Sequence, residues 1–400
     1  MNRISTAQAF DSALQQLQKR QTEMTEAQQQ LTTGKRVNRA SDDPTAAARA
    51  ERALASITRI DADKRGVEAS KGLMAMTEGA LGDAGELLQR ARELLVAAGN
   101  GTYGDAQRNS IAQELRGIRT QLLQVANRTD GADGYLFAGQ GASQPPFIDM
   151  PGAVQYRGTA GVAQIAGQEA LPLTMDGRAA WMSARTGNGQ FETLVTTSNG
   201  TATIGAGSVV DPAALTGSTY DIQFTVAGNG ATTYSVLRDG VATAQANVAY
   251  QPGTAIQIDG MAVPVSGTPA TGDAFQLRPP TSTLSVFDVM DKAVADLAST
   301  GRRSSQVTQD NVMNLRNIDQ VMTRLLSARA DAGDTLNRID GVNDRLDGLK
   351  LAGEIEKSSA EDLDMVQAIS DFQSKQSGYD AALKSYSMVQ RLSLFQYLNI

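Results

Sequence analysis

The sequence predicts an α+β fold in which the N- and C-terminal segments form a long α-helical coiled-coil rod with an inserted antiparallel β domain. Ten of the 11 prolines fall between Pro145 and Pro280, and the remaining one is Pro44. Both proline-free ends have helical apolar spacing, whereas the middle has strand-like alternation. Because a proline inside a helix removes a hydrogen bond and clashes with the preceding turn, its absence suits long uninterrupted helices.

The first segment, residues 1–43, is expected to be an inner coiled-coil helix followed by a turn. Its apolar residues recur at helical spacing, but Gln21 and Gln28 occupy the other row of the seam. Such a thin stripe buries too little apolar surface to offset the ordering of the chain. We therefore favour packing between molecules over an intramolecular bundle core. The predicted packing residues are Phe10, Leu14, Leu17, Met24 and Leu31.

A helix start is predicted where this segment ends, because acidic and hydroxyl residues come directly before a proline. Asp or Ser side chains accept hydrogen bonds from the free N–H groups of a first turn, and Pro is favoured at the first helical position. Asp42 and Asp43 could also form a pair of catalytic carboxylates, but capping explains them better. The predicted cap and turn residues are Gly34, Ser41, Asp42, Asp43 and Pro44.

Residues 44–140 are expected to form the N-terminal part of the helical rod. Apolar residues recur every seven positions from Ala53 to Leu95, with small residues three positions after the later ones. This pattern is typical of a helix that packs at a shallow angle against close neighbours. At ~1.5 Å per residue, a helix from Pro44 to Ala98 would be roughly 80 Å long. After a break at residues 100–104, a second helix is predicted from Ile111, Leu115, Ile118, Leu122 and Val125.

The middle, residues 141–282, is predicted to be an inserted β domain, either one unit or two divided near residues 205–208. It has 14 charged residues among 142, against 65 among the other 258. Apolar and polar residues alternate over residues 220–226, as in a strand with one buried face. Asp259 and Gly260 indicate a hairpin turn. Trp181 is expected in the core of this β domain.

Residues 283–357 are predicted to be the C-terminal part of the rod, and residues 358–400 the second inner coiled-coil segment. Residues 1–40 have a net charge of +3 and residues 331–400 a net charge of −5. This difference is explained either by chance and solvated helix faces or by packing of the two ends together. The predicted packing residues of this end are Ile369, Phe372, Tyr379, Leu383, Tyr386, Leu394 and Leu398.

Composition and motifs argue against an enzyme. The chain has no His and no Cys, which excludes catalysis by those groups and zinc sites built from them. Gly139-Gln140-Gly141 lacks the third glycine of a dinucleotide loop, and acidic Glu361, Asp362 and Asp364 lack the spacing of a calcium loop. We therefore expect no catalytic residues, no cofactor and no metal. An enzymatic insert stays as an unfavoured alternative.

Partners and location are also constrained by the sequence. A net charge of −7 argues against a nucleic-acid partner, which would need a basic surface. No segment is apolar enough to insert in a membrane, and the first residues lack the apolar stretch of a cleaved secretory signal.

Several motifs together resemble the bacterial flagellin family and, within it, the hook-associated protein 3 group that joins hook to filament. They cover about residues 1–147 and 284–400. The matching segments are Arg3-Ile4-Ser5-Thr6, residues 31–38 with 41–44, 98–102, 134–139 with 146–147, 329–333, 337–339, 361–364 and 393–398.

The resemblance implies a structural subunit of the hook–filament junction ring. It implies that the terminal helices form an inner coiled-coil tube, and that the β insert points outward. The implied partners are further copies of the chain, the neighbouring hook-associated junction protein, flagellin and an export chaperone. The implied location is the extracellular flagellum, reached through the flagellar type III apparatus. Flagellin itself, the filament subunit, is the alternative within this family.

Overall fold

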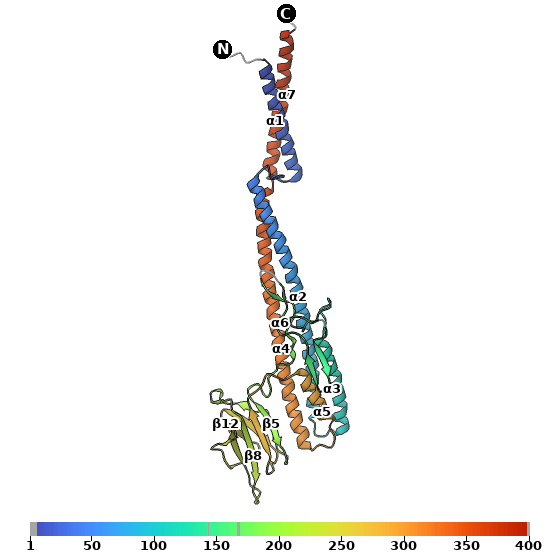
Figure 1. Cartoon of the computed structure of the whole chain (residues 1–400), viewed down its shortest axis with the longest axis vertical. Helices are drawn as coiled ribbons and strands as arrows, with labels where there is room; N and C mark the ends of the chain where they lie inside the picture. The colour runs from blue at the N-terminus through green and yellow to red at the C-terminus, as the bar shows by residue number, and fades with distance from the viewer. Residues whose placement is uncertain (1–5, 143, 166–168, 398–400) are drawn as a thin grey trace. The chain divides into compact units, whose positions relative to one another are not determined.

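The computed structural model describes residues 6–142, 144–165 and 169–397. Its residues separate into two compact units: one joins the chain up to residue 65 with the chain from residue 342 onward, and the other comprises residues 66–341. Two long helices, α2 (Pro44–Ala98) and α6 (Ser304–Glu361), contribute to both units (Figure 1).

The first unit consists of two pairs of helices. In one pair, α1 (Thr6–Thr33) lies beside α7 (Met365–Tyr397) (Figure 1). In the other pair, the first part of α2 lies beside the last part of α6. Half of its buried apolar side chains among the described residues are alanines, and the large ones are Val37, Ile57, Ile60, Val342 and Leu346. This unit therefore has only a thin core of its own.

The second unit has a helical core that follows the predicted heptad pattern. Met74, Leu81 and Leu88 of α2 are at most 2% exposed, and the small residues Ser70 and Ala84 that alternate with them are fully buried. The heptad prediction for α2 is confirmed. The other helices of this core are α3 (Asp105–Ala126), the short α4 (Gly177–Trp181), α5 (Val286–Ala298) and part of α6.

Part of the predicted insert belongs to this helical core. The hairpin of β1 (Phe147–Met150) and β2 (Ala153–Tyr156) supplies Phe147 and Tyr156 to it, and α4 supplies Trp181. The Trp181 ring lies 5.4 Å from Phe137 and 6.0 Å from Phe287, centroid to centroid. The expectation that Trp181 lies in the β-domain core is therefore wrong. A second small hairpin is formed by β3 (Gln164–Ile165) and β4 (Leu171–Pro172).

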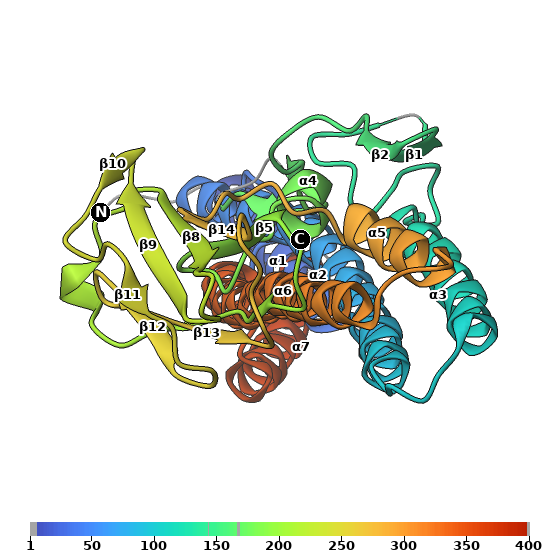
Figure 2. The ribbon, with the colours of Figure 1, turned by 90° about the horizontal axis from the view of Figure 1, so that it is seen from below.

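The rest of the insert forms two antiparallel sheets around a separate core (Figure 2). One sheet has the order β10-β9-β8-β14-β5, with β11 also on β9, and the other has β12-β13-β6, with β7 also on β13. Apolar side chains such as Ile222, Phe224 and Phe275 point into the core between them. The strands are β5 (Glu192–Thr197), β6 (Thr203–Ile204), β7 (Ser208–Val209), β8 (Tyr220–Val226), β9 (Thr232–Arg238), β10 (Val241–Ala242), β11 (Val248–Ala249), β12 (Ala255–Ile258), β13 (Met261–Ser266) and β14 (Ala274–Arg278).

Alternation and turn chemistry explain these strands. Tyr220, Ile222 and Phe224 of β8 are buried on one face, and Gln223 and Thr225, which alternate with them, are exposed. The β12–β13 hairpin turns at Asp259 and Gly260, whose φ angles are +38° and +79°. Two successive left-handed residues match the twist of the flanking strands, and Asp-Gly adopts them readily.

Three polar side chains on or beside α6 attach the β sheets to the helix. The guanidinium of Arg303 donates to the carbonyl oxygens of Ser198 and Asn199. The amide of Gln309 both accepts from the N–H and donates to the carbonyl of Ile204, at 2.7 and 3.0 Å. Arg316, 7% exposed, donates to Thr193. Because these bonds reach mainly backbone atoms, they fix the position of the sheet edge on α6 within this unit.

The α+β prediction is thus confirmed in its main terms: long helices come from both ends of the chain, and antiparallel sheets come from its middle.

Candidate assembly surface

The contact between α1 and α7 is a single seam whose side chains are mostly only partly buried. In α1 it comprises Phe10, Ala13, Leu17, Met24, Ala27 and Leu31, and in α7 Ala368, Phe372, Lys375, Tyr379, Ala382 and Tyr386. The α7 set alternates steps of four and three residues, and the α1 set does the same apart from one step of seven between Leu17 and Met24, as in the seam of a coiled coil. Ala27 is the one fully buried side chain among residues 10–33 and 365–388. Two helices alone therefore leave this seam half open to solvent.

Individual contacts in the seam show how the two helices approach. The rings of Phe10 and Tyr386 lie 5.5 Å apart and are tilted by 41°. Gly378 of α7 leaves room for the head group of Arg20, because a Cβ at Gly378 would meet the Arg20 guanidinium at 2.5 Å. A charged head group and a glycine thus lie beside the seam, where larger apolar side chains would give a monomer more buried surface.

The predicted packing residues divide into this seam and a second row beside it. Leu14 in α1 is 39% exposed, and Ile369 and Leu383 in α7 are 47% and 40% exposed. Val366, which the sequence reasoning did not select, continues the α7 row and is 83% exposed. In α7 the expected single stripe is therefore two adjacent rows, one against the partner helix and one facing solvent, whereas in α1 Leu14 is the predicted residue that lies outside the seam.

Two of the predicted packing residues cannot be placed in this way. Leu398 lies outside the residues that the structure describes. Leu394 lies within α7, in a stretch whose side chains are outside the described set.

The turn that precedes α2 is bonded to the segment between α6 and α7. Gly34 has a φ of +70°, which a side chain would disfavour. Its carbonyl accepts from the N–H of Leu363 at 3.0 Å, and the N–H of Arg36 donates to the carbonyl of Glu361 at 2.7 Å. The Lys35 ammonium lies 3.1 Å from the Glu361 carboxylate. These bonds hold the two crossovers of the first unit together.

Asp43 occupies the capping position of α2, and Pro44 follows as its first residue. The Asp43 carboxylate accepts from the N–H of Ala46 at 3.0 Å and from the hydroxyl of Thr45 at 2.8 Å. The Ala46 N–H, then Thr45 and Arg36, stabilise the charged form and lower the Asp43 pKa to about 2. These groups make local structure rather than catalysis.

The neighbouring acidic residues are used in the same way. Asp42 accepts from the N–H groups of Asn38 and Arg39, and the Ser41 hydroxyl lies 3.4 Å from its other oxygen. Asp364 accepts from the N–H groups of Val366 and Gln367 at the start of α7. Each carboxylate is thus engaged by backbone donors of a turn or a helix start.

Other exposed apolar residues of the first unit were missed by the sequence reasoning. Leu54 of α2 is 42% exposed, and Leu351 and Ile355 of α6 are 58% and 60% exposed. The seven-residue recurrence was followed for α2 alone, along the row that this helix buries. A signal was nevertheless present, because Leu351 and Ile355 are four residues apart and fall on one face of a helix.

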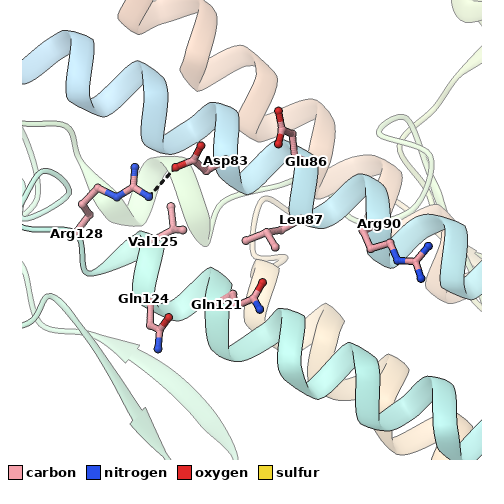
Figure 3. A pocket seen from close by; sticks show the side chains of 8 residues that line it. All are labelled: Asp83, Glu86, Leu87, Arg90, Gln121, Gln124, Val125 and Arg128. Atoms are coloured by element: carbon pink, nitrogen blue, oxygen red, sulfur yellow. Dashed lines mark hydrogen bonds and ion pairs between the residues drawn. The ribbon is translucent and has the colours of Figure 1, made fainter.

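Within the second unit, a groove of about 530 Å³ runs between α2 and α3 (Figure 3). Figure 3 shows Asp83 and Arg128 pointing toward each other across it, and they form an ion pair of 2.6 Å. Arg90 is paired with Glu114 at 2.8 Å. The charged groups of the groove are therefore largely paired with one another, an arrangement that offers no nucleophile with an adjacent base.

In the described part of the chain, no group of three or more Asp or Glu residues could hold a metal ion. Among the described helices, none is long and apolar enough to cross a membrane.

Comparisons with known proteins agree on one group. Residues 4–142 match the family described as the bacterial flagellin N-terminal helical region. Flagellar hook-associated protein 3 of Salmonella typhimurium is 25% identical, over 98% of this chain and 99% of its own length. The crystal structure of Xanthomonas campestris FlgL is 30% identical with a TM-score of 0.68, over 77% of this chain and 99% of that one. Polar flagellin E of Vibrio parahaemolyticus is 37% identical but aligns with only 30% of this chain.

Proposed function

The chain belongs to the flagellar hook-associated protein 3 family, and on this premise we propose that it is a structural subunit of the junction between hook and filament. The family is one of structural proteins of the flagellum and not of enzymes. The relatives of this group align along their whole length, whereas the filament protein named above aligns with less than a third of the chain. The junction subunit is accordingly favoured over a filament flagellin.

The observation that best supports a role in assembly is exposed apolar surface on both terminal helices, a row on α7 and Leu14 on α1. Leu14, Ile369 and Leu383 are 39–47% exposed in the single chain, beside a seam that two helices do not close. Burying apolar surface gains about 25 cal/mol per Å², so rows of this kind favour helix packing with further copies. We propose that α1 and α7 of many copies together form the inner coiled-coil layer of a ring.

The domain assignment follows from this role. Residues 1–43 and 358–400 are the proposed inner segments, and residues 44–140 and 283–357 the proposed outer helices. For the insert we propose the division shown by its two cores, with residues up to about 184 supporting the helices and 191–278 folding as the β domain.

The proposed location is the extracellular flagellum, with export through the flagellar type III apparatus without a cleaved signal. The proposed partners besides the chain itself are the neighbouring hook-associated junction protein, flagellin, and an export chaperone. Half-closed terminal helices fit an export substrate, because they give little stability to a free monomer and so cost little to unfold.

The test is incorporation of variants into flagella of a strain that lacks the gene. Leu383→Asp places a charge in the exposed α7 row, where it is tolerated in the free chain and becomes buried on assembly. We expect the free variant to keep the wild-type circular dichroism spectrum and to be absent from isolated hook–filament structures. The matched control is Val241→Asp, at a position of the β domain that is 70% exposed. Normal incorporation of Leu383→Asp would refute the assembly role of α7.

A further inference from the structure

The second helix pair of the first unit has two outer faces with complementary properties. In this pair, residues 44–65 of α2 pack against residues 342–361 of α6 through buried side chains, among them Ala50, Ile57 and Leu346. Since a helix turns by about 100° per residue, the side of each helix opposite its buried row faces solvent. These two outer faces differ in shape and in charge.

The outer face of α6 is apolar and acidic. Leu351 and Ile355 are 58% and 60% exposed and lie on the side of the helix opposite Leu346. Asp344 and Glu354 lie exposed near them, and neither forms an ion pair within the described part of the chain. Two large aliphatic side chains directed at water are an unfavourable arrangement for a surface that has no partner.

The outer face of α2 is small, with arginines along one flank and the exposed Glu51 on the other. Ala48, Ala55 and Ala62 recur every seven residues and are all exposed, on the side opposite the buried row. Arg52 and Arg59 are exposed along one flank of this alanine row. Neither arginine has a carboxylate partner among the described residues. Small side chains let a second helix approach closely, and large aliphatic side chains fill the space between them.

The vertical register of the two faces also agrees. A Cβ at Gly353 would lie 3.0 Å from Ile57, so these two residues are at the same level of the pair. The two helices run in opposite directions, so moving two residues forward along α6, to Ile355, corresponds to moving two residues back along α2, to Ala55. The large residue on one outer face is therefore level with the small residue on the other.

We propose that, in the ring, the α6 face of one copy, with Leu351 and Ile355, packs on the α2 face of the next copy, with Ala48, Ala55 and Ala62. Glu354 of the first copy then lies near Arg52 and Arg59 of the second. The occupant is a second copy of this chain because residues 44–65 have a net charge of +2 and residues 342–361 a net charge of −2. Different faces of one subunit meet in this contact, which is the head-to-tail kind that produces rings. The inference rests on the proposed function and adds a surface outside the terminal helices.

The decisive experiment uses the absence of native cysteine. Two variants, Ala55→Cys and Ile355→Cys, are co-expressed in the null strain, and isolated hook–filament structures are oxidised. We expect a disulfide-linked dimer that contains one chain of each variant, because the two Cα atoms would come within about 7 Å. Leu349→Cys replaces Ile355→Cys in the matched control. Leu349 is 50% exposed but lies on another side of α6, so we expect loss of the dimer.

Charge reversal tests the same contact without disulfides. Chains with Arg59→Glu or with Glu354→Arg alone should no longer be incorporated. A chain with both substitutions should be incorporated again, because an ion pair of reversed charge then forms between residues 59 and 354 of neighbouring copies. If the cysteine pair forms no dimer and the double reversal gives no recovery, the inference fails.

The Leu383→Asp variant separates this result from the proposed function. Loss of incorporation for Leu383→Asp, together with no cross-link between Ala55→Cys and Ile355→Cys, overturns the outer contact alone. Normal incorporation of Leu383→Asp together with a cross-link overturns the assembly role of α7 and keeps the outer contact.

Discussion

Replacing Phe147 by alanine should destabilise the helical core, although this residue lies inside the predicted β insert. Phe147 is 2% exposed, and its ring lies 5.1 Å from Tyr156 and 5.6 Å from Phe287. Removing a buried phenylalanine side chain costs about 3–5 kcal/mol of unfolding free energy. With a urea dependence of about 2 kcal/mol per M, the unfolding midpoint should fall by about 1.5–2.5 M.

The assay is urea unfolding followed by tryptophan fluorescence. The chain has one tryptophan, Trp181, and its ring lies 6.2 Å from that of Phe147, so its emission reports on the helical core alone. The matched control is Phe224→Ala, which removes a ring that is 1% exposed in the core of the β sheets. We expect this control to leave the Trp181 transition close to wild type. An equal shift for both variants would refute the division of the second unit into two cores.

Three other predictions address the turn, the β-domain attachment and the insert boundary. The pKa of Asp43 is lowered from 3.8 to about 2, so the Asp43 cap stabilises α2 fully above pH 3.8, and this stabilisation is lost as the pH falls through about 2. Titration of the Asp43 carboxyl group by NMR should show this lowered pKa, and a midpoint near 3.8 would contradict the prediction. Gln309→Ala leaves the N–H and the carbonyl of Ile204 without their hydrogen-bond partner, so limited proteolysis should cut residues 198–206 faster than in wild type. Unchanged cleavage would show that Gln309 does not hold this segment on α6. The backbones of Thr186 and Thr281 are hydrogen-bonded at 2.9 Å, so a Gly-Ser linker that joins them should leave the Trp181 fluorescence as in the intact protein. Excision of residues 141–282 also removes Phe147 and Trp181, so the helical core should no longer fold. Loss of helical circular dichroism in the first deletion would contradict this boundary.

Periodicity predicted the elements whose packing is local and repetitive. The heptad row of α2 could be identified because its large and small positions are all buried, from Met74 and Thr77 to Leu95 and Ala98. Strand β8 could be identified because only one of its faces is buried, so its residues alternate. In both cases this stretch of helix or strand packs on the same side along its whole length, so the spacing of its apolar residues alone shows which side is buried.

The division of the insert could not be predicted, because it depends on contacts between residues far apart in the sequence. The sequence around Phe147 and Trp181 has the composition of a β domain, yet both side chains pack against Phe287 of α5. The two rows on α7 are a similar case. Ile369 and Phe372 are both apolar and three residues apart, and only the position of α1 decides that Phe372 faces it and Ile369 faces solvent. The structure thus adds to the sequence the knowledge of which apolar row is buried and which is exposed.

The central claim is that α1 and α7 become fully packed only in the assembled junction. Hydrogen–deuterium exchange of the free chain and of isolated hook–filament structures tests it most directly, with the helical core around Leu88 as the internal reference. We predict rapid exchange of residues 10–33 and 365–388 in the free chain, slow exchange in the assembly, and slow exchange of the reference in both. Equally slow exchange of the two terminal helices in the free chain would contradict the account, because it would mean that a monomer closes the seam alone.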